Sequence, residues 1–413
     1  MDIDRLSNSP VGKLVPVRGT DARHGNFAYF AFVADPLPSD VTLRSATWAR
    51  VAEATAAISR LQQACLELPD PRLLIRPALW RESLDTSALE GTEGVLRELL
   101  EAQLPSAQYM TSETREIRAF QSMAGHAFEL VKRRPITVGF LSELQGELFQ
   151  EAENPPEDVG RVRQHIVWIG QKDQPIEASR FVPAPPDDRL QAGMDQWELW
   201  VRAEHPHLSP VLRSAMAHYQ LETLHPFGDG NGRLGRLVII LQALRSGALD
   251  QPALTLSPWL FRHRIQYQEQ LLEMSCTGDW NPWVSLFCTA VREQCDILIE
   301  NARKLVRWRE ESRHKVQEHR WTGVIYRVLE DLVDWPVITV GDAARKYSIS
   351  VPHATNTINH LVEIEILTEL TGRGYGRMFG AKYVMDTVDS LTSPGASTVP
   401  QQPSEQSQTV AAG

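Results

Sequence analysis

The sequence predicts a mainly α-helical fold: a helical core with a small β-hairpin flap set into it, followed by a C-terminal winged helix-turn-helix. Apolar residues recur at helical spacing over most of 45–152 and 208–312. Residues 160–186 break this rhythm, alternate in polarity like two short strands and end at prolines. Residues 318–386 then read as three helices followed by a glycine-rich hairpin, which is the order of a winged helix.

Composition bounds the class of protein. The chain has 413 residues, of which 42% are apolar and 23% charged, enough for two or three globular domains. No apolar run approaches the ~20 residues of a membrane span, and the N-terminus lacks a signal-peptide core, so we expect a cytoplasmic protein with no membrane partner. A net charge of −10 argues against a general nucleic-acid binder. The cysteines show no CxxC pairing and no zinc spacing, which indicates reduced, buried thiols.

The pattern along the chain divides it into four parts. Residues 1–110 form an N-terminal region with a strand over 27–38 and a helical stretch that stops at Gly91. Residues 111–312 form a helical core, with helices expected over 112–133, 136–152 and 208–223 and a further helix capped by Gly247. The winged helix follows over 318–386. The tail, 387–413, has almost no charge and no aromatic residue, and we expect it to be disordered.

The stretch HPFGDGNGRLGR, from His225 to Arg236, joins two of the predicted helices. Its glycines let the backbone approach a ligand closely and lead into a helix N-terminus, whose free N–H groups form an anion site. Arg233 and Arg236 are three residues apart on one helix face and can grip phosphate oxygens. Asp229 is a hard oxygen ligand suited to Mg²⁺. His225 can accept a hydroxyl proton near neutral pH.

These parts together indicate nucleotide chemistry. A glycine-rich turn between helices is usually structural, but the Arg-x-x-Arg pair with a histidine in front favours a functional site. The stretch is not a Walker A loop, because no Gly-Lys-Ser/Thr follows. Zinc ligation is also disfavoured, since His218 lies seven residues upstream of His225 and no cysteine is near.

At every defined position the stretch resembles the Fic-domain signature, His-x-Phe-x-(Asp/Glu)-Gly-Asn-Gly-Arg-x-x-Arg. The resemblance extends over about residues 25–310 and includes IG (169–170) and ASRFVPAPP (178–186), which look like the Fic flap. It implies a Fic helical core that transfers AMP from Mg-ATP (or Mn-ATP) to a Ser, Thr or Tyr hydroxyl of a target protein or of the enzyme itself. The implied partners are therefore ATP and a protein target.

The resemblance assigns roles position by position. His225 would be the base, Phe227 a buried anchor and Asp229 the metal ligand. The ATP-binding positions would be Gly230, Asn231, Gly232, Arg233, Arg236 and Tyr267, the last near the adenine. Ile169, Gly170, Phe181 and Val182 would form the flap edge on which an extended target segment docks.

A second match lies far upstream, in TSALEG (86–91). By itself it is a helix end, although a glutamate there is mildly unfavourable for the helix dipole. Thr86, Glu90 and Gly91 fit the (Ser/Thr)-x-x-x-Glu-(Gly/Asn) pattern of the inhibitory helix in the Fic class where that helix precedes the core. The resemblance then implies that Glu90 pairs with Arg236 and withdraws this arginine from the γ-phosphate.

Two alternatives stay open at this level. With Glu90 orienting a water, the same site could remove AMP from a modified protein. Alternatively, the protein could be a transcriptional regulator whose core senses nucleotide. Residues 318–386 hold seven Lys or Arg and nine Asp or Glu, a net charge of −2 before histidines, which disfavours DNA binding. We therefore favour a protein-docking or homodimer-forming winged helix.

Overall fold

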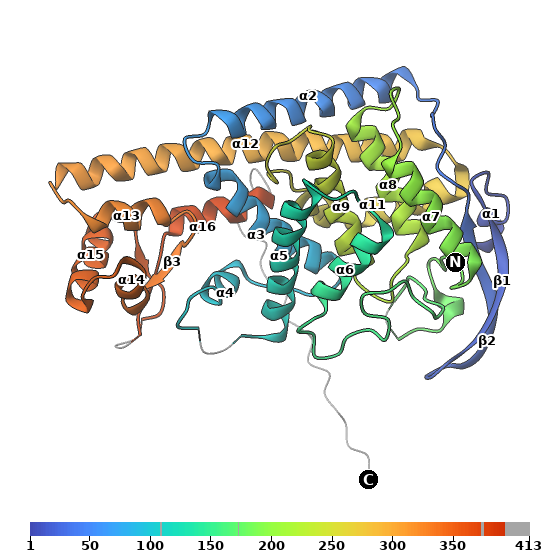
Figure 1. Cartoon of the computed structure of the whole chain (residues 1–413), viewed down its shortest axis with the longest axis horizontal. Helices are drawn as coiled ribbons and strands as arrows, with labels where there is room; N and C mark the ends of the chain where they lie inside the picture. Colours follow the sequence, from blue (N-terminus) through green and yellow to red (C-terminus); the bar gives the residue numbers. More distant parts are fainter. Residues whose placement is uncertain (108–109, 172, 373–375, 393–413) are drawn as a thin grey trace, which may run out of the picture.

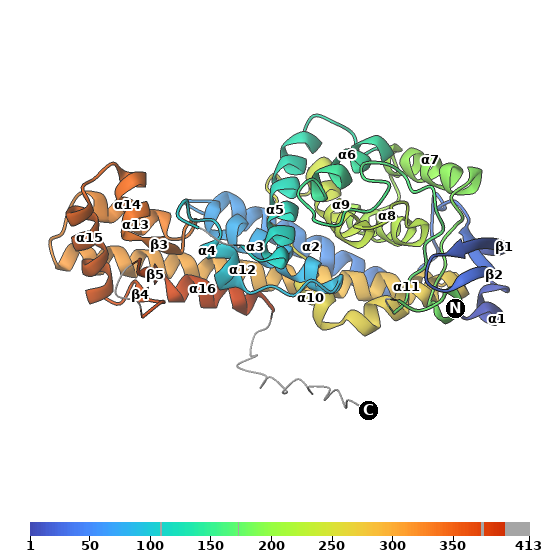
Figure 2. The ribbon, with the colours of Figure 1, turned by 90° about the horizontal axis from the view of Figure 1, so that it is seen from below.

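The computed structural model describes residues 1–107, 110–171, 173–372 and 376–392. The molecule is elongated, and the prediction of a mainly helical fold is confirmed (Figures 1 and 2). A β-ribbon lies at one end, the C-terminal elements lie at the other, and the helical core lies between them. Helices α2 and α12 pack side by side along the length of the molecule.

The bounds of the elements are as follows. The helices of the N-terminal region and the core are α1 (Ile3–Leu6), α2 (Ser45–Glu67), α3 (Arg72–Leu89), α4 (Leu96–Glu101), α5 (Ser112–Val131), α6 (Val138–Leu148), α7 (Asp188–Arg202), α8 (Pro210–Leu224), α9 (Asn231–Arg245), α10 (Ser257–Arg262), α11 (Arg264–Thr277) and α12 (Trp280–Glu318). The C-terminal elements are α13 (Val324–Asp331), β3 (Val337–Thr339), α14 (Val340–Tyr347), α15 (Val351–Glu363), β4 (Thr368–Glu369), β5 (Met378–Gly380), α16 (Lys382–Asp389) and the 3₁₀ turn η2 (Ser390–Thr392).

The N-terminal ribbon pairs β1 (Gly12–Asp21) with β2 (Gly25–Ala34) in antiparallel register, from Gly12 opposite Ala34 to Asp21 opposite Gly25. The strand expected over 27–38 corresponds to β2, but β1 is not among the predicted strands. Pro16 weakens the strand signal of β1, because proline lacks a ladder donor. Within the described residues β1 pairs only with β2, so it has a free edge at which a missing amide donor costs no ladder hydrogen bond.

The helical core follows the predicted apolar faces. On α2, the stripe of Val51, Ala54, Ile58 and Leu61 is buried, and this helix packs against α12. Helix α7 was not predicted; its N-cap is Asp187, whose side chain accepts a hydrogen bond from the Arg189 amide. Helix α12 continues to Glu318, six residues past the predicted core boundary at 312.

Two further predictions need correction. Within the described residues of 160–186, the only ladder contact is the isolated bridge between Ile169 and Phe181, with a 3₁₀ turn (η1, Ile176–Ala178) between them. The expected flap hairpin is thus a loop pinned at one point. At the C-terminal end, 382–389 form α16 instead of a strand, and 387–392, expected in the tail, are helical. The rest of the predicted tail, 393–413, lies outside the described residues.

The C-terminal elements begin with α13, α14 and α15. Strand β3, which lies between α13 and α14, forms a small antiparallel sheet with the later strands, in the order β3–β5–β4. All four cysteines are free and buried, as predicted. None of the helices in the described ranges combines the length and apolar character that a bilayer crossing requires.

Candidate active site

The glycine-rich stretch forms a tight turn between α8 and α9. His225 ends α8 in the left-handed region, with φ 48° and ψ 59°, and Gly230 opens α9 with φ 85°. Asn231 closes the turn: its Oδ1 accepts a hydrogen bond from the Phe227 amide and its Nδ2 donates to the Phe227 carbonyl, both at 2.8 Å. Phe227 is fully buried, which confirms it as an anchor. The Asn231 side chain therefore shapes the turn.

Arg163 holds this turn from the opposite side. Its guanidinium is buried and donates to the carbonyls of His225 at 2.8 Å, His165 at 3.0 Å and Ala184 at 2.6 Å. Burial lowers the pKa of Arg163 to about 10. Sequence reasoning missed this residue, because nothing in RVRQ distinguishes it from the exposed Arg161. Only tertiary packing gives Arg163 its role as a clamp on the backbone beside the predicted base.

His225 is prepared to accept a proton. Burial lowers its pKa to about 4, and the charge of Arg163 adds to this effect, so the imidazole is neutral at pH 7. Its Nδ1 lies 3.4 Å from the Glu222 carbonyl oxygen. A carbonyl can only accept, so this contact places the ring proton on Nδ1 and leaves the Nε2 lone pair free.

The turn opens onto a cavity of about 660 Å³. Its lining brings together residues predicted from four separate parts of the sequence: Glu90, Ile169, Gly170, His225, Arg236 and Tyr267. Another cavity, of about 440 Å³, lies beside Trp200 and Arg213, away from the motif. The larger cavity is thus the one where the candidate base and arginine meet.

Arg236 is buried, and two of its guanidinium nitrogens bond the end of α3. Its Nε donates to the Thr86 hydroxyl at 2.8 Å, and its Nη2 donates to the Thr86 carbonyl at 3.0 Å and to Glu90 Oε1 at 2.6 Å. Burial alone would raise the pKa of Glu90, but the charge and hydrogen bond of Arg236 outweigh it and hold the pKa below its usual value. Glu90 is therefore an ionised partner of this arginine.

Backbone geometry delivers Glu90 to this position. Gly91, with φ 95°, is the left-handed residue after α3. The amides of Gly91 and Thr92 bond back to the carbonyls of Ala88 and Ser87, which is a Schellman ending. On the opposite side, a Cβ at Gly232 would lie 2.1 Å from Glu90 Oε1. Glycine at 232 thus admits the carboxylate as well as any ligand.

Arg233 is also paired, which the sequence did not predict. Its Nη1 forms an ion pair with Glu116 Oε1 on α5, and its guanidinium lies 5.2 Å from the centre of the Phe149 ring. The other carboxylate oxygen of Glu116 accepts a hydrogen bond from the Thr92 hydroxyl at 3.1 Å. Glu116 therefore links the first motif arginine to the turn that follows Glu90. No local sequence pattern singles out this glutamate.

The far wall of the cavity is polar and buried. The Tyr267 hydroxyl lies 2.8 Å from His218 Nε2, and burial raises the tyrosine pKa. Burial also raises the pKa of Glu222 to about 7, against the opposing charge of Arg236. Tyr267, the residue predicted to contact the adenine, lines the cavity, and its hydroxyl is already hydrogen-bonded to His218.

The flap residues divide into two groups. Ile169 and Phe181 exchange backbone hydrogen bonds of 2.8 and 3.1 Å, and both line the cavity with Gly170. Val182, predicted as a docking residue, is fully buried instead, and its carbonyl accepts the Phe32 amide at 2.8 Å. The segment after Phe181 is thus tied to β2 at Val182, and the burial of Val182 argues against its predicted docking role.

Asp229 is the candidate metal ligand. Its side chain is 57% exposed, and its Oδ1 accepts the Gly230 amide at 2.6 Å and lies 3.8 Å from Arg233 Nη2. Within the described residues, no cluster of three or more His, Cys, Asp or Glu side chains could enclose a metal ion. Mg²⁺ in nucleotide sites takes one or two carboxylates plus substrate phosphates and waters, so a lone exposed carboxylate at a helix N-terminus fits such a site.

Comparison with known proteins agrees with this geometry. Residues 135–243 match the Fic/DOC family, and residues 48–129 match the Fic/DOC family N-terminal region. The chain is 27% identical over 229 residues to "Protein adenylyltransferase Fic" of Drosophila ananassae, covering 54% of this chain and 42% of that protein. It is 31% identical over 145 residues to the protein of the same name from Culex quinquefasciatus, covering 35% and 26% respectively.

The chain thus spans well under half the length of these curated relatives. Among solved structures, a Fic family protein from Desulfovibrio desulfuricans G20 superposes with a TM-score of 0.51 at 20% identity, covering 84% of this chain and 98% of that one. This likeness concerns the fold. The chain therefore carries a Fic domain of the Fic/DOC family, preceded by that family's N-terminal region.

Proposed function

We propose that this protein is an autoinhibited protein adenylyltransferase, which transfers AMP from Mg-ATP to a Ser, Thr or Tyr hydroxyl of a target protein or of itself. The observation that carries the proposal is the engagement of Arg236 by Thr86 and Glu90 beside a neutral His225. The name shared by the curated relatives supports the reaction class.

The transfer can be written with these side chains. Nε2 of His225 accepts the proton of the acceptor hydroxyl, whose oxygen forms a bond to the α-phosphorus. The bond between that phosphorus and the bridging oxygen breaks, and pyrophosphate leaves. Backbone N–H groups at the start of α9 and the guanidinium of Arg236 meet the negative charge that develops.

Asp229 would hold Mg²⁺ against the phosphates. When bound, the cation would neutralise phosphate charge and orient the α-phosphate for attack. The Gly230 amide donates a hydrogen bond to Asp229 Oδ1, and this bond orients the exposed carboxylate at the start of α9.

Inhibition follows from competition for one guanidinium. A charge-assisted, partly shielded pair contributes about 1.5–3 kcal/mol, enough to suppress a competing contact about tenfold or more. While Glu90 holds Arg236, the γ-phosphate lacks this partner, and the α-phosphate is misplaced for attack.

For the C-terminal elements we propose a winged helix that docks protein. The helices α13–α15 followed by β4 and β5 support this interpretation, as does the acidic balance of 318–386. Sequence-specific DNA binding by the full chain at physiological salt would contradict it.

The test of the adenylyltransferase compares wild type with Glu90→Gly, using ATP labelled at the α-phosphate and, in parallel, at the γ-phosphate. We expect about tenfold or more extra self-labelling by the variant from α-labelled ATP and none from γ-labelled ATP. Labelling from γ-labelled ATP would indicate phosphoryl transfer instead. No label on the folded variant or on any protein of a lysate would remove the proposal.

A further inference from the structure

Helix α3 carries the predicted inhibitory residues at its C-terminal end, and one of its faces also packs against the C-terminal elements. We define the C-terminal module as the described part of 324–392. Leu73 is fully buried in an apolar cluster with Leu305, Ile325 and Leu329. The N-terminal turn of α3 is thus built into the module and the end of α12.

The middle of α3 makes a second contact with the module. Trp80 and Leu84 are buried in a cluster that includes Val337 and Val388. Helices α3 and α16 also pack against each other. Apolar packing therefore fixes α3 against the module at two levels before the helix reaches Thr86.

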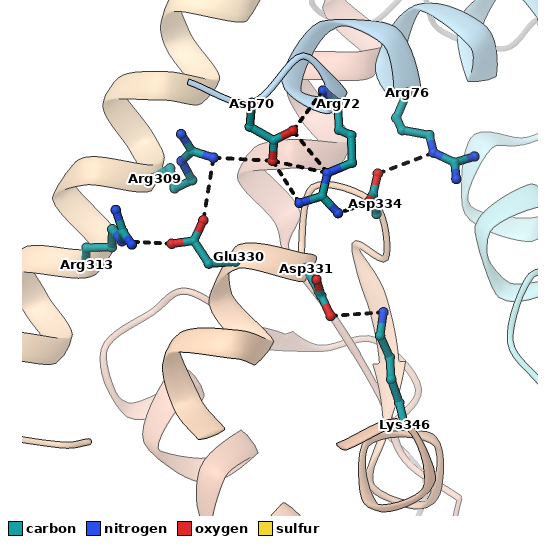
Figure 3. A network of polar contacts seen from close by, with 9 residues as sticks. All are labelled: Asp70, Arg72, Arg76, Arg309, Arg313, Glu330, Asp331, Asp334 and Lys346. Carbon is teal, nitrogen blue, oxygen red and sulfur yellow. Dashed lines mark hydrogen bonds and ion pairs between the residues drawn. The ribbon is translucent and has the colours of Figure 1, made fainter. Parts of the chain in front are cut away.

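An ion-pair network reinforces the first contact (Figure 3). Asp334 of the module accepts a hydrogen bond from Arg72 Nη1 at 2.5 Å, and its other carboxylate oxygen forms an ion pair with Arg76 Nε at 3.3 Å. Arg309 of α12 lies 3.5 Å from both Asp70 and Glu330, and so connects the start of α3 to α13. The side chains of Asp334 and Arg309 are only 11% and 7% exposed, so solvent screens these pairs less than surface pairs.

The two ends of α3 thus hold different partners. Residues 72–76 bind the module, while residues 86–90 bind Arg236, about 20 Å further along a helix that rises 1.5 Å per residue. Pro77 lies between them and lacks the amide donor of a regular helix, which gives α3 a weak point at which it can bend. A shift of the module can therefore move or tilt the end that carries Glu90.

We propose that the C-terminal module controls the inhibition of the active site through α3: its contacts with residues 72–84 hold Glu90 on Arg236, and loosening them frees Arg236. The proposal rests on the proposed function. Coupling between two sites is reciprocal, so ATP that displaces Glu90 also weakens the contact between α3 and the module.

The test uses Asp334→Asn in the full chain, with Arg76→Met as a milder second variant in case the first is unstable. Neither residue belongs to the catalytic machinery. We expect both to raise self-labelling from α-labelled ATP, by about fivefold or more for Asp334→Asn. In the Glu90→Gly background neither should add to the signal, because the inhibitory contact is already absent.

Lys346→Met is the matched control. Lys346 pairs with Asp331 inside the module at 3.1 Å, in the same region, without touching α3. It should label like wild type. Activation by Lys346→Met equal to that by Asp334→Asn would show general loosening of the module and overturn the proposal.

Hydrogen–deuterium exchange gives a readout that does not need activity. We expect faster exchange of the amides of 82–92 in Asp334→Asn and Arg76→Met, and no change in Lys346→Met. Unchanged exchange in both α3-contact variants overturns the coupling. If Glu90→Gly itself transfers no AMP, the adenylyltransferase proposal fails, while the exchange experiment still decides whether the module and the end of α3 are coupled.

Discussion

The two ends of the glycine-rich motif are in opposite states. At the proposed acceptor end, His225 is neutral and lines a cavity; the Arg163 side chain bonds its carbonyl, and the Asn231 side chain bonds the backbone of Phe227 nearby. At the phosphate end, Arg236 and Arg233 are both paired with carboxylates, Glu90 from α3 and Glu116 from α5. His225 is thus free to accept a proton, whereas both arginines already bind carboxylates of the protein itself.

This difference indicates which end of such a site can be blocked with the least disruption of the fold. Disordering the base would require disrupting buried hydrogen bonds that also hold the fold. Occupying the arginines needs only a carboxylate that can leave again, since a guanidinium binds carboxylate and phosphate with the same fork geometry. The inhibition proposed above would therefore act on the arginines and leave His225 ready.

The largest expected effect comes from removing the base at the acceptor end. In the Glu90→Gly background, His225→Ala should reduce AMP transfer by about 10²–10⁴-fold, because the acceptor hydroxyl loses its proton acceptor. ATP affinity, measured by calorimetry, should stay nearly unchanged, since His225 contributes little to holding phosphates. Transfer at the rate of the parent variant would show that both ends of the motif do not act together.

The clamp beneath the acceptor end is the next target. Arg163→Met should lower the free energy of unfolding by about 3 kcal/mol, because the buried carbonyls of His225, His165 and Ala184 lose a charged donor. Urea denaturation measures the change. Arg161→Met, at a neighbouring exposed position, is the control and should have no measurable effect. A stable Arg163→Met protein would mean that the acceptor end is held by other contacts.

A smaller effect is expected at Arg233. Glu116→Gln removes a negative charge from beside this arginine while keeping a hydrogen-bond acceptor for Thr92. ATP should bind about two- to fivefold more tightly, because a partly exposed ion pair contributes up to about 1 kcal/mol. The measurement is ATP affinity in the His225→Ala background, which excludes turnover. Weaker binding would show that Glu116 positions Arg233 for phosphate instead of competing with it.

The smallest expected change concerns pH. The pKa of His225 is lowered to about 4, so its base form persists as pH falls, whereas an ordinary histidine would be mostly protonated below about 6.5. Between pH 6.5 and 5.5, kcat/KM of Glu90→Gly should therefore fall by less than about twofold from this group. Removing Glu90 also removes a charge that raises the His225 pKa, which strengthens the expectation. A fall in kcat/KM centred near pH 6.5 would show that His225 titrates like a solvent-exposed histidine.

Local sequence patterns predicted much of this architecture. The apolar stripes of α2, α5 and α8, the glycine-rich turn and the ending of α3 at Gly91 were all foreseen, because each depends on residues within one or two turns of chain. Helix α7 and the loop form of the flap were not. Strand-like alternation does not show whether a segment finds a partner strand, and Val182 instead bonds to β2.

The sequence by itself determined which chemical groups are present: a histidine, a carboxylate, glycines and two arginines in one short stretch, and a glutamate at a helix end upstream. What only the tertiary structure decided is which charges meet. Glu90 and Arg236 are 146 positions apart and Glu116 and Arg233 are 117 apart, so no local spacing rule joins them. Arg163 and Arg161 look alike in the chain, and burial alone makes the first a clamp. The physical reason is that helix and turn propensities act over a few residues, whereas ion pairing and desolvation depend on where whole helices pack.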